Sequence, residues 1–420
     1  MPPTQHDNPA APPPTMWALR LHGPGFGNLR LEEVPTPTPA VGQLLGRVEA
    51  ALVCASDLKI IEQGSDHTLM YGWDLARHPV PIGHEGGIAV ARVGEGLPDE
   101  YAVGRRFAVQ PAVPAAPRHH RDRYRDQAEG LQKVLIGYTL DGLFAEYVLI
   151  TEEVIETGCL LPLPDPQLPS YAAALAEPLS CVVSAQEHTV HILKDSPAHP
   201  RAPRLGPKPG GLVVVVGAGP MGRLHVELAL LHGPSKVIVS DPNSARLDKL
   251  RATLAAKAAR RGVSLVCTHP DRLPSVVSTE SGGRGADDLI LAVGMREVQE
   301  QSLALLAKGG VANLFGGLKS GDHTISIDAR RLHYDSISLV GSSGGDPSDV
   351  AKALSLLADG AIDAGAYIAA VGGLDAATDL LEAVRDQRLD GKALIYPALR
   401  SPLRFVDGWS ADKEREFLGR

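Results

Sequence analysis

Apolar residues are distributed in two different ways along the chain. From Met16 to about Leu149, short apolar runs are broken by Gly and Pro, a pattern typical of strands in an irregular β-rich domain. From Gly210 onward, apolar runs alternate with helical patterns, and Leu212–Val216 is apolar throughout, as in a strand buried on both faces of a parallel sheet. Strands that alternate with helices predict βαβ units and a doubly wound sheet.

The same pattern predicts individual elements. In the first part of the chain we expect strands at 44–54, 87–93, 106–109 and 144–150, followed by a helical stretch at 179–191. In the second part we expect strands at 212–216, 236–240, 263–267, 288–293, 310–315 and 338–340, and helices from 220 to 231 and at 244–260. The chain then closes with helices at 349–359 and 376–386 and a strand at 393–396.

Length and composition narrow the class of protein. A chain of 420 residues exceeds what one compact core usually holds, which favours two domains. The first fifteen residues hold six prolines and almost no large apolar residue, so we expect residues 1–15 to form a disordered tail without a secretory signal.

Charge and cysteine content exclude several functions. The 41 Lys and Arg against 49 Asp and Glu give a net charge of −8, which makes the chain a poor nucleic-acid binder. No apolar run approaches the roughly 20 residues that span a bilayer, so no membrane partner is expected. The 4 cysteines are too few for a disulfide scaffold, which favours a reducing, cytoplasmic compartment.

A glycine-rich turn follows the buried strand at 212–216. Gly217, Gly219 and Gly222 fit the pattern G-x-G-x-x-G, in which the glycines allow the tight turn, the approach of a pyrophosphate and close helix–strand packing. The next strand ends at Asp241, 19 positions after Gly222, where a carboxylate can accept hydrogen bonds from the adenosine ribose. The predicted cofactor-binding residues are Gly217, Gly219, Pro220, Met221, Gly222, Asp241, Arg246 and Gly294.

Asp241 also bears on the choice of cofactor. Its carboxylate would repel a 2′-phosphate, so we expect NAD rather than NADP. Ser240, Asn243 and Arg246 lie nearby and could soften this preference.

Three segments upstream carry groups that bind metals: Cys54, His84 with Glu85, and Glu177 before Pro178. Taken singly, a cysteine is more often a small buried apolar residue, and a Glu before a Pro often starts a helix. Together these segments supply a thiolate, an imidazole and carboxylates, a set that suits Zn²⁺ with one position open for water or substrate.

With these motifs, residues 16–400 resemble the medium-chain dehydrogenase/reductase superfamily of zinc alcohol and polyol dehydrogenases. The resemblance implies an α/β fold, with a GroES-like β-rich catalytic domain (16–185, completed by 343–420) and a doubly wound Rossmann domain (186–342). It places the catalytic zinc ligands at Cys54, His84 and Glu177, with Glu85 as a ligand or a group that exchanges with one. Ser56 matches the hydroxyl that begins a proton relay, and Asp57 the carboxylate that orients the ligand histidine.

Two departures from the family matter. Members with a structural zinc carry four closely spaced cysteines in a lobe that corresponds to 113–140, where this chain has none, so we expect one catalytic zinc and no structural zinc. The position often held by a relay histidine is Lys59, which could relay a proton, bind an anionic substrate or be solvated.

Several segments resemble a narrower branch, the sorbose-1-phosphate reductases. They are Arg106-Phe107, Gln110–Ala112, Leu175–Pro178, Gly219–Gly222, Gly341–Gly345, Gly372–Ala376, Gly391-Lys392 and Leu394–Tyr396. This resemblance implies a polyol, sugar or sugar-phosphate substrate.

The leading hypothesis is therefore a zinc-dependent oxidoreductase that transfers a hydride between NAD(H) and a secondary alcohol or ketone. Zn²⁺ would lower the pKa of the substrate hydroxyl, hydride would pass to the nicotinamide, and Ser56 would pass the proton outward. The alternatives are a zinc-free NAD(P)H reductase of the same fold and a non-enzymatic dinucleotide-binding sensor. The partners implied are a small-molecule substrate and other copies of the chain, in a homodimer or homotetramer.

The sequence leaves the roles of several other residues undecided. The basic run 118–125 could be a solvated loop, a phosphate contact or a subunit contact. His188 and His191 are expected to share a helix face as structural or surface residues. Residues 401–420 end in a charged helical stretch to which no function is assigned.

Overall fold

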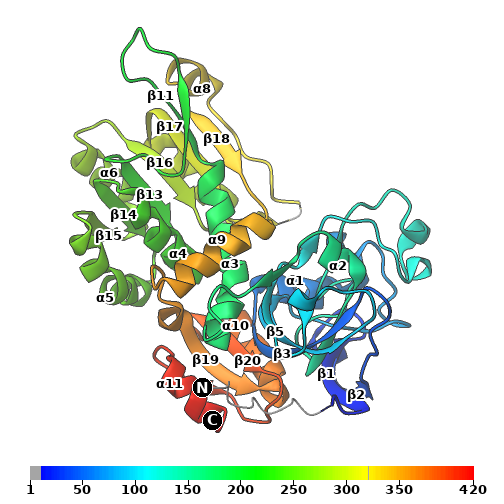
Figure 1. Ribbon diagram of the computed structural model, residues 1–420. Helices are drawn as coiled ribbons and strands as arrows, with labels where there is room; N and C mark the ends of the chain where they lie inside the picture. The colour runs from blue at the N-terminus through cyan, green and yellow to red at the C-terminus, as the bar shows by residue number, and fades with distance from the viewer. Residues whose placement is uncertain (1–10, 320) are drawn as a thin grey trace. The chain divides into compact units, whose positions relative to one another are not determined.

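The computed structural model describes residues 11–319 and 321–420, which form two compact units (Figure 1). The first comprises the described residues up to Glu177 together with Asp346–Arg420, and the second comprises Pro178–Gly345. The sequence predicted the domain boundaries after residues 185 and 342. One helix, α3 (Ser170–His188), crosses the first boundary.

Most of the expected tail, residues 1–10, lies outside the described residues. Its last residue is an exception to the prediction, because Thr15 begins strand β1 (Thr15–Leu21). The strand pairs with β2 (Leu29–Pro35), and Thr15 lies opposite Pro35 in the register. Prolines just before a strand therefore do not keep Thr15 out of the sheet.

A mixed sheet organises the first unit. Strand β3 (Leu44–Leu52) pairs antiparallel with β5 (Glu85–Val93), β9 (Tyr147–Ile150) and β20 (Lys392–Tyr396). The sheet also contains β6 (Arg106–Val109), β10 (Leu160–Pro162), β19 (Ile368–Gly373) and β21 (Arg404–Phe405). The strand order is β10-β6-β5-β3-β20-β19-β21, and β9 pairs with β3 beside this path. Strands from the end of the chain thus complete the sheet of its first part, as the family resemblance implied.

Smaller elements surround this sheet. Strand β1 also pairs with β4 (Val80–Pro81), and β7 (Ala112–Val113) pairs with β8 (Val134–Leu135). The helices of the first unit beside α3 are α1 (Ala55–Gln63), α2 (Glu152–Glu156), α9 (Pro347–Ala358), α10 (Ala377–Arg385) and α11 (Ala411–Phe417).

The second unit is the expected doubly wound domain (Figure 1). Its parallel sheet has the order β15-β14-β13-β16-β17-β18, formed by β13 (Leu212–Val216), β14 (Lys236–Ser240), β15 (Ser264–Thr268), β16 (Ala286–Leu291), β17 (Leu306–Leu314) and β18 (Ser338–Gly341). This is the strand order of a dinucleotide-binding sheet, in which the order reverses beside β13. A hairpin of β11 (Val190–Leu193) and β12 (Ala202–Leu205) precedes it.

Helices cover both faces of this sheet because the side chains of β13 alternate between two apolar cores. Val213 and Val215 pack with α4 (Pro220–Ala229) and α5 (Ser244–Arg260). Leu212, Val214 and Val216 pack on the other face with α6 (Leu273–Ser281) and with Leu303, which follows α7 (Arg296–Ser302). The remaining helix is α8 (Ala329–Tyr334).

Two local predictions are wrong. Glu177 and Pro178 were expected before a helix that starts at residue 179, but α3 already begins at Ser170, so both residues lie inside it. His191 was expected on that helix, but the helix ends at His188 and His191 lies in β11. His191 is buried there, with Nε2 2.7 Å from Oδ1 of Asp288.

No helix among the described residues is both long enough and apolar enough to cross a membrane.

Candidate active site

Cys54 lies where strand β3 gives way to helix α1. It is the residue that caps the helix, and Asp57, in the first turn, completes a capping box with it. The backbone N–H of Cys54 donates to Oδ2 of Asp57 over 2.8 Å. The Asp57 side chain is fully buried, so this contact fixes the backbone that presents the Cys54 sulfur.

The other oxygen of Asp57 holds His84. Nδ1 of His84 lies 2.9 Å from Oδ1 of Asp57, and both side chains are buried. Because an ionised carboxylate can only accept, Nδ1 carries a proton, and Nε2 is the nitrogen left to bind a metal. Burial lowers the pKa of His84, but the charge and hydrogen bonds of Asp57 and Cys54 outweigh it and hold the pKa well above its usual range.

Glu85, the first residue of β5, forms a buried ion pair with Lys392 of β20. Nζ of Lys392 lies 2.7 Å and 2.6 Å from the two carboxylate oxygens. Burial lowers the pKa of Lys392, but the Glu85 carboxylate, with further contributions from Cys54 and Glu177, raises it above its usual range. The ammonium therefore stays charged and compensates the carboxylates that gather here.

The structure brings Cys54, His84 and Glu85 together. One ligand atom from each lies within 4.8 Å of the others. Glu177 is not in that set, but its carboxylate is close enough to influence the pKa values of Lys392 and Tyr138. A thiolate, an imidazole held by Asp57 through Nδ1 and neighbouring carboxylates form a donor set that fits Zn²⁺. The predicted ligands thus occupy one neighbourhood of the first unit.

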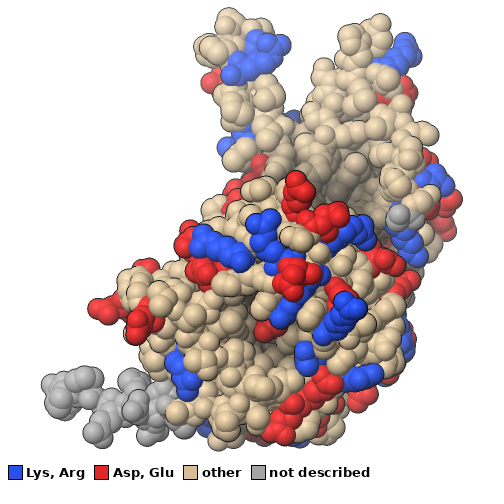
Figure 2. Space-filling model, turned by 90° about the vertical axis from the view of Figure 1, so that its right-hand side faces the viewer, with Lys and Arg blue, Asp and Glu red and all other residues tan. Residues whose placement is uncertain are grey.

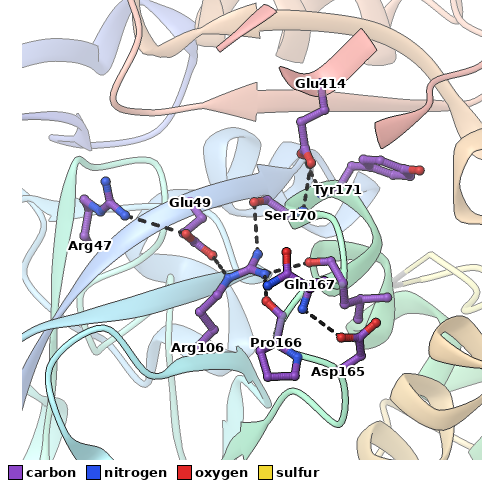
Figure 3. A network of polar contacts seen from close by, with 10 residues as sticks. Arg47, Glu49, Arg106, Asp165, Pro166, Gln167, Ser170, Tyr171 and Glu414 are labelled. Carbon is purple, nitrogen blue, oxygen red and sulfur yellow. Dashed lines mark hydrogen bonds and ion pairs between the residues drawn. The ribbon is translucent and has the colours of Figure 1, made fainter. Parts of the chain in front are cut away.

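A polar network holds the start of helix α3, which carries Glu177 in its second turn (Figure 3). The backbone N–H groups of Ser170 and Tyr171 each donate over 3.1 Å to the carboxylate of Glu414, on helix α11. Tyr396 donates to the same carboxylate over 2.9 Å. The carboxylate satisfies amides that a helix leaves without partners at its first turn.

Arg106 of β6 approaches the same helix start from another side (Figure 3). It donates to the carbonyl of Leu168 over 2.7 Å and to Oγ of Ser170 over 3.2 Å. Its Nε donates to Glu49 of β3 over 2.5 Å. The network therefore connects the strand that leads to Cys54 with the helix that carries Glu177.

Two further predicted residues lie on helix α1. Ser56 is half-buried and Lys59 is exposed. Among the described residues neither side chain has a hydrogen bond or ion pair, so both are available to a substrate.

The glycine-rich turn of the second unit has the backbone that the motif requires. Gly217 has φ 104°, and a Cβ there would lie 2.8 Å from Val293. A Cβ on Gly222 would lie 1.9 Å from the carbonyl oxygen of Gly217, which explains why helix α4 can start so close to the turn. Gly219, which caps α4, faces open space where a pyrophosphate could approach. Pro220 and Met221 form the first turn of α4.

Gly294 lies apart from this turn in sequence. A Cβ on Gly294 would lie 2.5 Å from the Gly317 carbonyl oxygen.

Asp241 is buried directly after β14. Its Oδ2 accepts the Ala218 N–H over 2.8 Å and its Oδ1 accepts the Asn243 N–H over 2.8 Å. Nη1 of Arg246 is 3.9 Å from Oδ2. The carboxylate is thereby fixed against the glycine-rich turn, beside a guanidinium that could meet a phosphate.

Part of the basic run 118–125 is paired with acidic residues. Arg118 forms an ion pair with Glu156, and Nε2 of His119 lies 2.8 Å from Glu152. The guanidinium of Arg123 lies 5.5 Å from the ring centroid of Trp73. On the face shown in Figure 2, the coloured Lys and Arg side chains are interspersed with Asp and Glu rather than gathered into one basic area.

Two family models match the chain. The alcohol dehydrogenase GroES-like domain matches residues 40–165, and the zinc-binding dehydrogenase domain matches residues 220–359. Together these ranges include the Cys54 and His84 segments and part of the glycine-rich turn.

Relatives match over almost the whole chain. The uncharacterized protein YggP of Escherichia coli is 32% identical over 395 residues, covering 92% of this chain and 87% of that protein. Mannitol-1-phosphate 5-dehydrogenase of Aliivibrio fischeri is 30% identical over 404 residues, with 93% and 89% covered. L-sorbose 1-phosphate reductase of Klebsiella pneumoniae is 29% identical over 396 residues, with 93% and 90% covered.

Solved structures share the fold. A zinc-binding dehydrogenase from Sinorhizobium meliloti, bound to NADP, matches with a TM-score of 0.68 and 26% identity, covering 91% of this chain and 99% of that one. The 2R,3R-butanediol dehydrogenase of Bacillus subtilis matches with a TM-score of 0.70 at 21% identity, with 91% and 99% covered. The chain therefore belongs to the zinc-binding alcohol and polyol dehydrogenases of the medium-chain dehydrogenase/reductase superfamily.

Proposed function

We propose that this protein transfers a hydride between NAD(H) and a secondary alcohol or ketone of a polyol, sugar or sugar phosphate. The observation that carries the proposal is the cluster of Cys54, His84 and Glu85, whose ligand atoms lie within 4.8 Å of one another. Relatives named as mannitol-1-phosphate and sorbose 1-phosphate enzymes support the substrate class.

The chain's own residues would divide the work as follows. Cys54, His84 and a carboxylate of Glu85 or Glu177 would hold one Zn²⁺, which when bound makes a substrate hydroxyl more acidic. By accepting the Nδ1–H of His84, Asp57 orients the ring so that Nε2 is the nitrogen that would bind the metal. Oγ of Ser56 would accept the proton from the substrate hydroxyl and release its own toward solvent. If Glu177 binds the metal, Lys392 would hold Glu85 in their ion pair. If Glu85 binds the metal, Lys392 would release it.

We propose NAD as the cofactor, with Gly217, Gly219, Pro220, Met221, Gly222, Asp241, Arg246 and Gly294 as its site. The buried Asp241 carboxylate supports NAD because it would repel a 2′-phosphate. Arg246 is the residue that would favour NADP, which a structural relative binds. We further propose one catalytic zinc, no structural zinc, and a homodimer or homotetramer.

Metal dependence distinguishes this function from its alternatives. We expect the zinc-loaded protein to turn over at least one compound in a panel of polyols and polyol phosphates with NAD. Cys54→Ala should reduce turnover by about 10³-fold or more, because the substrate hydroxyl loses the metal that acidifies it. NADH should still bind, measured by its fluorescence. Cys267→Ala, in strand β15, is the matched control and should leave turnover unchanged.

Two outcomes would contradict the proposal. Turnover by metal-depleted Cys54→Ala would favour a zinc-free reductase. NADH binding by the zinc-loaded protein without turnover of any compound would favour a dinucleotide-binding sensor.

A further inference from the structure

His67 is a half-buried histidine outside the predicted site. It caps the short helix Thr68–Met70, and its Nδ1 accepts the backbone N–H of Leu69 over 3.2 Å. Because Nδ1 accepts, the proton of the neutral ring is on Nε2. No hydrogen bond or ion pair occupies Nε2 among the residues that the structure describes. The ring therefore offers one free donor.

One aromatic ring separates His67 from the metal-binding cluster. The ring centroid of Tyr138 is 5.7 Å from that of His67 and also 5.7 Å from that of His84. The hydroxyl of a tyrosine carries its proton at neutral pH and can donate a hydrogen bond. Within the described part of the chain, this hydroxyl has no hydrogen-bond partner. A second free donor thus lies between His67 and the reacting centre.

Lys59 adds a positive charge near His67. It is exposed on helix α1, and its charge lowers the pKa of His67, in addition to the larger effect of burial. Asp57, Glu62 and Asp66 are the nearby carboxylates in sequence, and none of them lies within ion-pair distance of Lys59 in the described structure. The ammonium is therefore not neutralised by the protein.

We propose that Lys59, Nε2–H of His67 and the Tyr138 hydroxyl form the subsite that binds the phosphate of a phosphorylated polyol or ketose. The proposal rests on the function proposed above, since it places the phosphate on the far side of Tyr138 from His84 while the reacting carbon lies at the metal-binding cluster. Three neighbouring donors, one of them cationic, complement a group with several acceptor oxygens and a charge near −2.

The chemistry of the neighbouring groups suits this role for Lys59. Nε2–H of His67 and the Tyr138 hydroxyl can both donate hydrogen bonds, as the Lys59 ammonium does, so all three groups complement an anion. An anion bound here would satisfy all three groups at once.

The test compares a phosphorylated and an unphosphorylated substrate. D-mannitol 1-phosphate and D-mannitol are assayed with NAD on the zinc-loaded enzyme and on its Lys59→Met and His67→Gln variants. We expect each variant to lower the ratio of kcat/KM for the phosphorylated over the unphosphorylated compound by about 10- to 100-fold, mostly through KM. Lys59→Arg should restore most of the ratio. Lys133→Met removes an exposed charge elsewhere in the first unit and should leave the ratio unchanged.

Binding is measured in parallel so that turnover is not the sole readout. Calorimetric titration of the zinc-loaded, NADH-bound enzyme with D-mannitol 1-phosphate should give an affinity that Lys59→Met weakens by about 10-fold or more.

The outcomes separate the two proposals. If Lys59→Met lowers kcat/KM equally for both substrates, Lys59 acts on proton transfer and the phosphate subsite is overturned. A wild-type enzyme with no preference for the phosphorylated compound would also overturn it. An unchanged affinity of Lys59→Met for D-mannitol 1-phosphate would also overturn the phosphate subsite. Failure of the zinc-loaded wild type on the whole polyol panel would instead contradict the proposed function.

Discussion

His225 is a fully buried histidine on helix α4, directly after the glycine-rich turn. The side-chain amide of Gln186 donates to its carbonyl oxygen over 2.8 Å, and its ring packs edge-on against Phe315, with centroids 4.5 Å apart. Burial lowers the pKa of His225 from 6.5 to about 3, since no carboxylate compensates a charge there. The folded protein therefore keeps this ring neutral.

This residue predicts how acid destabilises the fold. Below pH 6.5 the unfolded chain takes up a proton at residue 225, whereas the folded chain does not until about pH 3. The free energy of unfolding should therefore fall with pH by about 1.4 kcal/mol per unit within this window, and by about 2 kcal/mol between pH 6.5 and 5. Above the window the residue should have no effect on pH dependence.

The measurement is urea unfolding at pH 7 and pH 5. His225→Leu removes the titrating group while keeping an apolar side chain, so its loss of stability between the two values should be smaller than that of the wild type by about 2 kcal/mol. His333→Leu, at an exposed histidine, should behave like the wild type. Equal pH dependence of stability in His225→Leu and the wild type would mean that burial does not lower the pKa of His225 in the folded protein.

Single residues were predictable from sequence where a short motif carries the chemistry. Cys54 and the His84-Glu85 pair were found because their side chains belong to such motifs, and the structure brings them together. Lys392 could not be assigned its role, because its partner Glu85 is 307 residues away in sequence and meets it only through strand pairing. His67 was missed because a lone histidine in a loop has no periodicity or motif to mark it.

At the scale of elements, helix α3 shows how the position of a proposed metal ligand, Glu177, can depend on a distant part of the chain. The carboxylate that caps the first turn of α3 comes from Glu414 on the C-terminal helix α11, to which no function was assigned from sequence (Figure 3). Burial raises the pKa of Glu414, and the hydrogen bonds from Tyr396 and the two backbone amides oppose that rise. The C-terminal helix thus supports the element that carries Glu177.

Glu414→Ala should destabilise the first unit by about 1–3 kcal/mol, because it leaves two helix amides and the Tyr396 hydroxyl without their acceptor. The measurement is thermal unfolding of the zinc-loaded protein. Glu416→Ala, at an exposed position of the same helix, is the matched control and should change little. If both variants unfold like the wild type, the cap contributes nothing and α3 is held by its packing alone.

The start of α3 also shows where pattern reasoning fails. A Pro at position 178 is typical of a first helical turn, which placed the start of the helix too late. In the structure Pro178 lies inside the helix, and the first turn is fixed by Glu414 and Arg106, which come from elsewhere in the chain. By contrast, Leu212–Val216 was bounded correctly because a strand buried on both faces needs no partner information to be recognised.

At the scale of the whole molecule, the proposed metal content depends on how the segment 113–140 is held. It contains no cysteine. Its basic residues contact α2 through the pairs of Arg118 with Glu156 and His119 with Glu152, and Arg123 lies against Trp73. Ion pairs and an aromatic contact thus fasten this segment without four thiolates. We therefore expect close to one zinc per chain in protein purified without chelators, measured by elemental analysis.

A second group of possible metal ligands, one of them in this segment and two on α2, bears on the expected zinc content. Ligand atoms of His119, Glu152 and Glu153 also lie within 4.8 Å of one another. However, His119 and Glu152 already bond to each other over 2.8 Å, and Gln43 donates to the second oxygen of Glu152 over 2.8 Å, so a metal would have to displace these contacts. A value near two that falls to one in His119→Gln would show that a metal does so. A value near one in the wild type that falls to near zero in Cys54→Ala would place the zinc at the cluster of Cys54 and His84, because losing the thiolate removes one of the few ligands that hold it there.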